Sequence, residues 1–265
     1  MFLARPGEYP PCGIFNIEHL ILLISTFIVI VFAVKYTKIK EKKDVTKIIR
    51  IATIIVWILE ILKIAFVFSV GNGGKLNKVV PLYYCSLLLY TGILSSIGKG
   101  IFKRLGDVFL ATGALVAGIV FMFFPTTSLP EYPVFHFMSL HSFFFHGMMV
   151  YVSCIVNKTN YIEIKRTDIK YYASLIFIIC VAAYIVNSLY GSNLMFISQN
   201  FPGTPIEFVY ELSGKWFPIV MSVIQMTLPF YIIYALKLLK DKFTKGEKEN
   251  KPLKVAKKLY LKNGE

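Results

Sequence analysis

Charged residues are scarce in this 265-residue sequence. Asp, Glu, Lys and Arg make up 17% of it, whereas a soluble domain usually carries about a quarter. Acidic residues are the scarcer kind, with 15 Asp and Glu against 29 Lys and Arg, so the formal net charge is +14. Hydrophobic residues make up 56% of the chain. This balance excludes a soluble globular enzyme and a disordered chain, and it is typical of a membrane protein.

Cysteine is also scarce. The four residues, Cys12, Cys85, Cys154 and Cys180, show neither Cys-x-x-Cys spacing nor a paired histidine spacing. Their pattern argues against a zinc site and against a disulfide framework, so we expect no metal and no cofactor. The basic residues lie in short clusters between apolar runs rather than across an aromatic or polar surface, which argues against a nucleic-acid-binding protein.

Long apolar runs, in contrast, are abundant. A helix needs about 20 apolar residues to cross a bilayer, and seven runs of about this length predict an all-α, polytopic membrane protein with a seven-helix transmembrane bundle. The runs are residues 15–34, 48–70, 79–97, 108–124, 134–156, 171–190 and 216–236. We expect residues 1–240 to form this bundle and residues 241–265 to form a lysine-rich cytoplasmic tail facing anionic lipid.

The basic residues are unevenly divided between the two sides of this bundle. By this assignment 24 of the 29 lie in the first, third and fifth connections and the tail, four lie on the other side, and Lys63 lies within a span. Cytoplasmic loops carry the excess of Lys and Arg in membrane proteins. We therefore expect an N-terminus outside the cell membrane, a cytoplasmic C-terminus and an odd number of spans.

Several polar side chains interrupt the apolar runs, where ionisable groups are costly and usually face a bundle interior or a wet cavity. They are His19, Glu60, Lys63, His136, His141, His146, Asn187 and, just beyond its span, Asn193. A rise of 1.5 Å per residue places Cys85 about 9 Å, His141 about 10 Å and Glu60 about 15 Å from the outer edges of their spans. The polar groups therefore gather in the outer half of the bilayer, where we expect a buried site.

Each of these residues also has a purely structural explanation. A cysteine in a span is usually a small packing residue, and a histidine there can hydrogen-bond a neighbouring helix. Glu60 and Lys63 are three residues apart and can neutralise each other. His136, His141 and His146 are spaced by five residues, about 140° around a helix, so they cannot all face one cavity. At most one or two of them are expected to be functional.

A cysteine and a histidine at matched depth suggest a nucleophile and its base. An imidazole can accept the thiol proton, and a carboxylate such as Glu60 can orient that imidazole. In the outer leaflet this pair suits acyl chemistry on a lipid ester, through a thioester that is passed to a second acceptor or to water. We expect Cys85 Sγ and a His141 nitrogen to lie within about 4 Å of each other.

Nearly the whole chain, from His19 to about Ile233, resembles the YwaF family of bacterial integral membrane proteins. The matching elements are residues 81–87, residues 135–142, the set Asn187, Gly191, Asn193, Met195, Phe196 and Pro202, more loosely residues 216–218, and the single residues His19 and Glu60. Tyr83 and Tyr84 depart from the residues usual in that family. The family is similar to the eukaryotic transmembrane protein 164 group, described as a phospholipid acyltransferase that uses a cysteine and a histidine. This resemblance implies those roles for Cys85 and His141.

The leading hypothesis is a membrane-embedded acyltransferase or lipid-ester hydrolase that acts on outer-leaflet phospholipid or lipoprotein acyl chains. The expected partners are membrane lipids, with a lipoprotein as one acceptor, and not nucleic acid. Cys85 and His141 are the expected catalytic residues. The expected supporting or substrate-binding residues are His19, Glu60, Tyr84, Asn187 and Asn193.

Two alternatives stay open at the level of sequence. In the first, the chain is a transporter or a receptor-like small-molecule binding protein, and Glu60, Lys63 and the histidines line a substrate or proton path. In the second, the chain is a structural membrane protein whose polar groups tie the helices together.

Overall fold

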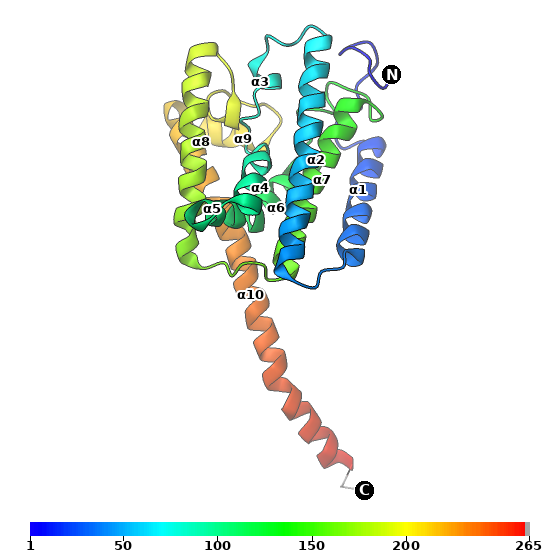
Figure 1. Ribbon diagram of the computed structural model, residues 1–265, viewed down its shortest axis with the longest axis vertical. Coiled ribbons are helices and arrows are strands. Elements are labelled where there is room, and N and C mark those ends of the chain that lie inside the picture. The colour runs from blue at the N-terminus through cyan, green and yellow to red at the C-terminus, as the bar shows by residue number, and fades with distance from the viewer. Residues whose placement is uncertain (263–265) are drawn as a thin grey trace.

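The computed structural model describes the backbone of residues 1–262 and the side chains of residues 1–243. These residues form helices and connecting loops, with no β-strand among them, which confirms the predicted all-α class. Figure 1 shows the helices gathered into a bundle, with the N-terminus near one end. The last helix, α10 (Phe217–Lys262), leaves the bundle at the opposite end.

Six stretches of helix among the described residues are long and apolar enough to cross a membrane, as expected of a multi-pass membrane protein. They are α1 (Ile17–Tyr36), α2 (Lys42–Ser69), the stretch Gly100–Phe123, α7 (Phe137–Lys158), the stretch Arg166–Tyr190 with α8 (Ile169–Tyr190), and the stretch Pro205–Phe243 with α9 (Pro205–Ser213) and the first part of α10. Three short 3-10 turns precede the last three helices: η1 (Arg166–Asp168) precedes α8, η2 (Leu194–Phe196) precedes α9, and η3 (Gly214–Trp216) precedes α10.

The third predicted helix, residues 79–97, is wrong as a single helix. The structure has the four-residue helix α3 (Leu76–Val79), a non-helical segment at residues 80–86, and the 11-residue helix α4 (Leu87–Ile97). Pro81 lacks an N–H and disfavours helical backbone in the residue before it. A helix of the length of α4 covers only about 16 Å, roughly half of a hydrocarbon core. We call residues 80–86 the strap.

The predicted helix at residues 108–124 is also divided. It consists of α5 (Gly100–Ala111) and α6 (Gly113–Phe123), which meet at Thr112 with φ −126° and ψ −80°. A Cβ on Gly113 would lie 2.7 Å from Tyr84 Oη and 2.9 Å from Tyr172 Cε2, so aromatic side chains press on the chain at this break. In Figure 1, α5 lies across the direction of α2 instead of parallel to it.

Helix α7 is the central element, and it contacts α1, α2, α5 and α6. Its approach to α6 depends on Gly118, where a Cβ would lie 2.6 Å from Val150 Cγ2 and 2.8 Å from His146 O. The helix begins at Phe137, and the side chain of His136 caps it by accepting a hydrogen bond from Met138 N. His136 therefore lies just before the helix. The predicted boundary at residue 134, which placed His136 within the span, is wrong by three residues.

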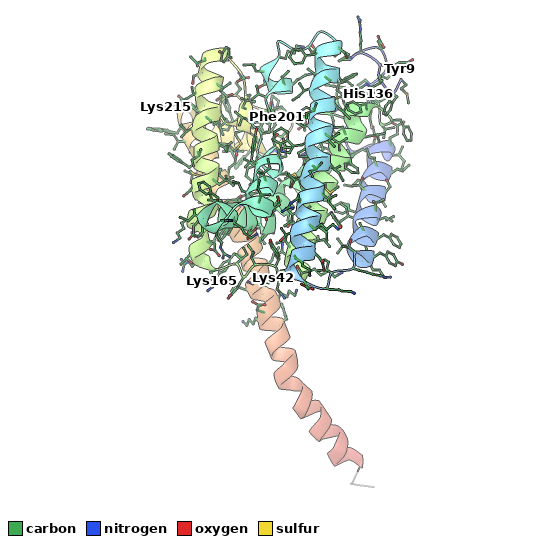
Figure 2. The ribbon with its side chains drawn as sticks, viewed as in Figure 1. Tyr9, Lys42, His136, Lys165, Phe201 and Lys215 are labelled. Atoms are coloured by element: carbon green, nitrogen blue, oxygen red, sulfur yellow. The ribbon has the colours of Figure 1, made fainter. Side chains whose placement is uncertain are left out.

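The basic connections gather at one end of the bundle. Figure 2 shows Lys42 and Lys165 at the end from which α10 emerges, and Tyr9 and His136 toward the other. This distribution agrees with the uneven division of charge in the sequence. The assignment of this end to the cytoplasm stays a prediction. The predicted tail at residues 241–265 lies almost entirely outside the residues whose side chains are described.

Candidate functional site

The strap, which carries Cys85, is anchored to helices on several sides. The hydroxyl of Tyr84 is hydrogen-bonded to that of Tyr172 on α8. The ring of Tyr83 packs on Phe196, with ring centroids 4.9 Å apart, and Tyr90 Oη on α4 donates to Pro81 O at 3.1 Å. Non-helical backbone at membrane depth is tolerated where protein surrounds it. These contacts hold the half-buried Cys85 thiol just before α4 begins.

An ion pair on α2 provides the charges of this region. Lys63 Nζ lies 2.5 Å from Glu60 Oε1, and the two side chains are 18% and 3% exposed. Both charges act electrostatically on Cys85, and Lys63 acts on His141 as well. The i,i+3 spacing puts both groups on one face of α2. Helix α2 packs against α4, which follows the strap, and against α7, which carries His141.

His141, on α7, is buried without hydrogen bonds. Its ring is 7% exposed and lies between the rings of Phe137 and Phe145, at centroid distances of 5.8 and 6.0 Å. Neither Nδ1 nor Nε2 has a hydrogen-bond partner, so the expected pairing of the Cys85 thiol with His141 is not formed as a hydrogen bond in this structure. The backbone of Leu59 on α2 lies within reach of a weak hydrogen bond to the ring. Most buried polar groups are well hydrogen-bonded, so a ring whose nitrogens lack a well-formed bond is able to take a proton or a ligand.

His146, farther along α7, is half engaged. Its ring stacks on Phe121 with centroids 3.5 Å apart, and Nδ1 lies 2.7 Å from Ser142 O. Its Nε2 has no partner, and both His141 and Lys63 act on it electrostatically. The imidazole of His146 is therefore close enough to interact electrostatically with that of His141. One nitrogen of His146 is already hydrogen-bonded.

His19 lies apart from this group and is fully bonded. Its Nδ1 accepts a hydrogen bond from Phe15 N at 3.1 Å, so Nε2 carries the proton and donates to Met122 O at 3.0 Å. The side chain is completely buried and packs near the ring of Phe143 on α7. These contacts tie the start of α1 to α6, which is the structural role that any histidine in a span can have.

His136 likewise uses both nitrogens. Its Nδ1 accepts from Met138 N at 3.1 Å, and Nε2 lies 3.1 Å from Ala4 O. The ring stacks on Tyr132 with centroids 4.4 Å apart. Burial lowers the pKa of His136 below its ordinary value of 6.5, and the positive charge of the chain's N-terminus acts in the same direction. His136 therefore fixes the N-terminal segment against the start of α7.

Asn187 and Asn193 organise the loop between α8 and α9. Asn187 donates to Leu194 O at 3.0 Å and accepts from Leu194 N at 2.7 Å. Asn193 Oδ1 accepts from the N–H groups of Ser198 and Gln199 at 3.1 and 3.0 Å. Asn is suited to such side chain–backbone bonds. The side chains of both residues are thus engaged within the loop.

This loop in turn supports the strap. Met195 and Phe196 adopt positive φ values of 58° and 53°, a conformation that non-glycine residues adopt only at a cost. Gln225 Nε2 on α10 donates to Met195 O at 2.7 Å and holds the turn. Through this turn the ring of Phe196 reaches Tyr83, two residues before Cys85. The two asparagines therefore support Cys85 only indirectly, through the loop that carries Phe196.

The model of the TMEM164 family matches residues 14–235, which is most of the chain. The chain belongs to the TMEM164 family. Among curated proteins and among solved structures, no match was found. The matched segment includes the strap, the ion pair of α2 and every histidine of the chain, so these features lie within the part of the TMEM164 family protein that is similar to its relatives.

Lys63 is the residue of this TMEM164 family site that the sequence analysis undervalued. The sequence alone indicates a charge partner of Glu60 or, in the transporter alternative, a residue lining a path, and gives Lys63 no role in acyl transfer. In the structure its charge acts on Cys85, His141 and His146. The available signal was that Lys63 is the one basic residue assigned to the interior of a span. Among the described residues, no group of three or more His, Cys, Asp and Glu side chains is placed to hold a metal ion.

Proposed function

We propose that this TMEM164 family protein is a membrane-embedded acyltransferase or lipid-ester hydrolase, with Cys85 as nucleophile and His141 as general base. The proposal depends on one observation, the buried imidazole of His141 that lacks a well-formed hydrogen bond. The charge of Lys63 acts on both this imidazole and Cys85. The likeness to the transmembrane protein 164 group, described as a phospholipid acyltransferase, favours this class of reaction. The likeness to the YwaF family favours a bacterial protein of the cell membrane.

In the first half of the proposed reaction, Cys85 Sγ attacks the carbonyl carbon of a lipid ester. The thiol proton passes to a vacant nitrogen of His141 as the carbon–sulfur bond forms. The tetrahedral intermediate then collapses, the carbon–oxygen ester bond breaks, and the imidazolium returns the proton to the leaving lysolipid oxygen. The products are a lysolipid and an acyl thioester on Cys85.

In the second half, His141 takes the proton of an acceptor hydroxyl or amine, or of water. The acceptor attacks the thioester carbonyl, the carbon–sulfur bond breaks, and the proton returns to the sulfur. A second lipid or a lipoprotein as acceptor makes the protein a transferase, and water makes it a hydrolase. The proposed partners are thus membrane lipids and, as one acceptor, a lipoprotein.

Lys63 has the right charge to stabilise the oxyanion of both intermediates, because positive groups in a water-poor site stabilise developing negative charge strongly. Glu60 would then be a positioning residue that holds the Lys63 ammonium at 2.5 Å. Tyr84, Asn187 and Asn193 would position the strap, and His19 would position α1 against α6.

The test is acyl transfer by purified protein in detergent or nanodiscs supplied with isotope-labelled phospholipid. We expect label to appear on a second lipid or as free fatty acid, and this turnover to fall at least a hundredfold in Cys85→Ala and in His141→Gln, as for loss of a nucleophile or a base. Cys154→Ala, which removes another half-buried free cysteine, is the matched control and should retain full turnover.

Two results would overturn the proposal. One is a wild-type protein that releases and transfers no label from any phospholipid class supplied. The other is turnover that survives Cys85→Ala. If proton-coupled uptake of a solute into vesicles survived Cys85→Ala but disappeared in Glu60→Gln, the protein would be a transporter instead.

A further inference from the structure

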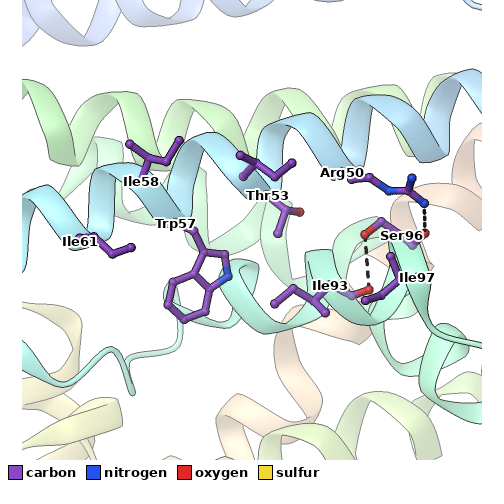
Figure 3. A pocket seen from close by; sticks show the side chains of 9 residues that line it. Arg50, Thr53, Trp57, Ile58, Ile61, Ile93, Ser96 and Ile97 are labelled. Carbon is purple, nitrogen blue, oxygen red and sulfur yellow. Dashed lines mark hydrogen bonds between the residues drawn. The ribbon is translucent and has the colours of Figure 1, made fainter.

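A groove of about 330 Å³ lies between α2 and α4, on the Arg50 side of the Glu60–Lys63 pair. Its walls are almost entirely apolar and include Trp57, Ile58, Ile61, Ile93 and Ile97, and Arg50 also lines it. Figure 3 shows Arg50 near one end of the row of α2 side chains and Ile61 at the other. Arg50 and Ile61 are eleven positions apart, which corresponds to about 16 Å of helix. The groove therefore follows about three turns of α2, and Arg50, the one charged residue among those that line it, lies at one end.

The shape of the groove follows from how closely α4 approaches α2. Gly92 has no side chain, and a Cβ there would collide with Thr53, so the two helices meet at the floor of the groove. Trp57 Nε1 donates to Leu89 O at 3.1 Å, which fixes the indole as a wall. Ile58, Ile61 and Ile97 are each more than half exposed. On helices at membrane depth, an exposed apolar face of this kind contacts lipid chains.

The guanidinium of Arg50 has more N–H donors than its hydrogen bonds within the described residues use. Its Nη2 donates to Ser96 O at 3.0 Å, and among the described residues no carboxylate is paired with it. Lys47 lies one turn earlier on α2, and Lys99 follows two residues after Ile97. The planar guanidinium matches phosphate oxygens better than an ammonium does. The charged end of the groove is thus complementary to an anionic headgroup.

We propose that this groove binds one acyl chain of an anionic phospholipid, with the lipid phosphate on the free N–H groups of Arg50. The apolar walls take the chain, and the surplus of positive charge at the Arg50 end selects a headgroup with a net negative charge. The proposal does not depend on the acyl chemistry at Cys85, because binding here involves no bond making.

The test compares retention of two lipids by the full chain in native mass spectrometry, dioleoylphosphatidylglycerol and dioleoylphosphatidylcholine. The wild-type protein should retain the anionic lipid with about tenfold preference, as for one charge-assisted contact. Arg50→Gln should reduce that preference to about twofold or less, and Arg50→Lys should give an intermediate value because it keeps the charge and loses the fork. Lys170→Gln, which removes a cation on α8, should change nothing.

The groove itself is tested by filling it. Ile58→Trp should reduce retention of both lipids several-fold, whereas Ile178→Trp, at a position on α8 that is also more than half exposed, should not. Wild-type protein that retains the two lipids equally, or Arg50→Gln that keeps the full preference, would overturn the proposal. A wild-type dimer that becomes a monomer in Ile58→Trp would also overturn it, since a second copy would then cover the groove. Cys85→Ala must keep the preference, which separates this test from that of the proposed function.

Discussion

Three buried histidines of this protein differ in what their nitrogens do. Both nitrogens of His19 and of His136 are hydrogen-bonded, and each ties a helix end to a neighbouring segment. Both nitrogens of His141 are unbonded, although leaving a buried polar group unsatisfied costs about 1–3 kcal/mol. The proposed role of His141 as a general base requires an imidazole nitrogen that can take a proton, and this would explain why the fold accepts the cost at His141.

The Glu60–Lys63 pair gives a prediction at the residue scale. Glu60→Gln leaves the Lys63 ammonium without its carboxylate in a site where the partner side chain is only 3% exposed. Removing one member of a buried pair costs about 3 kcal/mol, and we expect that loss in the free energy of unfolding, measured by titration with sodium dodecyl sulfate.

The control for this prediction removes both charges. Glu60→Leu combined with Lys63→Met leaves no unpaired charge, so most of the lost stability should return. If the double variant is no more stable than Glu60→Gln, the loss does not come from an isolated Lys63 charge.

His136 gives a prediction for pH. Because burial lowers its pKa below 6.5 in the folded protein, the unfolded chain binds the proton more readily. Its contribution to stability is therefore complete above about pH 6.5 and is lost as the pH falls below that value. The melting temperature should fall between pH 7.5 and pH 5, and by less in His136→Asn, since Asn keeps the N-cap acceptor. An identical fall in both proteins would contradict this origin.

The sequence was sufficient to predict how deep the residues of the candidate site lie in the bilayer, but not which side chains they contact. The helical rise of 1.5 Å per residue and the cost of ionisable groups in a span are enough to single out Cys85, Glu60 and His141. Which nitrogen of which histidine is bonded depends on neighbours far away in the sequence, such as Met122 for His19. Asn187 and Asn193 were expected to be supporting or substrate-binding residues, and the side chain of each is hydrogen-bonded to the backbone of the loop between α8 and α9.

At the scale of elements, the strap and the break at Thr112 are the features that hydropathy misses. A run of apolar residues says nothing about whether the backbone is helical throughout. Pro81 does not decide the question either, because proline is well tolerated in the first turn of a helix. The hydrogen bond from Tyr84 to Tyr172, 88 positions away in the sequence, is long-range, so no local pattern predicts it.

The contact of α6 with α7 gives a prediction for Gly118. In Gly118→Ala the new methyl would lie 2.8 Å from His146 O and 2.6 Å from Val150 Cγ2, and overpacking of this kind costs about 1–3 kcal/mol. The melting temperature in detergent should fall.

Gly147→Ala on α7 is the matched control for Gly118→Ala. The nearest atom to its new methyl is Thr26 Cγ2 at 3.2 Å, and alanine is favoured over glycine in a helix by about 1 kcal/mol. This variant should be as stable as the wild type or more so. Equal losses in the two variants would show that the α6–α7 contact is not specially tight.

At the scale of the whole molecule, charge and apolar helices give one consistent picture. The connections that carry Lys42 and Lys165 share the end from which α10 leaves the bundle, and the N-terminal segment lies toward the other end (Figure 2). Composition together with the lengths of the apolar runs was sufficient to predict the all-α class and a multi-pass membrane protein. It was not sufficient for the number of spanning helices, because the chain passes through the strap without forming a helix.

The orientation is testable by cysteine labelling in intact cells, with the four native cysteines replaced by alanine. Under the positive-inside rule, Tyr9→Cys should react with a membrane-impermeant maleimide, and Lys42→Cys should react only after the cells are permeabilised. Both side chains are exposed, so access to the reagent depends on the side of the membrane. The reverse labelling pattern would contradict the predicted orientation.

The most direct test of the central claim, that Cys85 and His141 act together on a lipid ester, is to map acyl groups on the protein. Purified protein is incubated with phospholipid, quenched in acid and digested, and the acyl thioester is located by peptide mass spectrometry. We expect a hydroxylamine-sensitive acyl group on Cys85 of the wild type that fails to form in His141→Gln. No acyl group on Cys85, or equal acylation of Cys85 in His141→Gln, would contradict it.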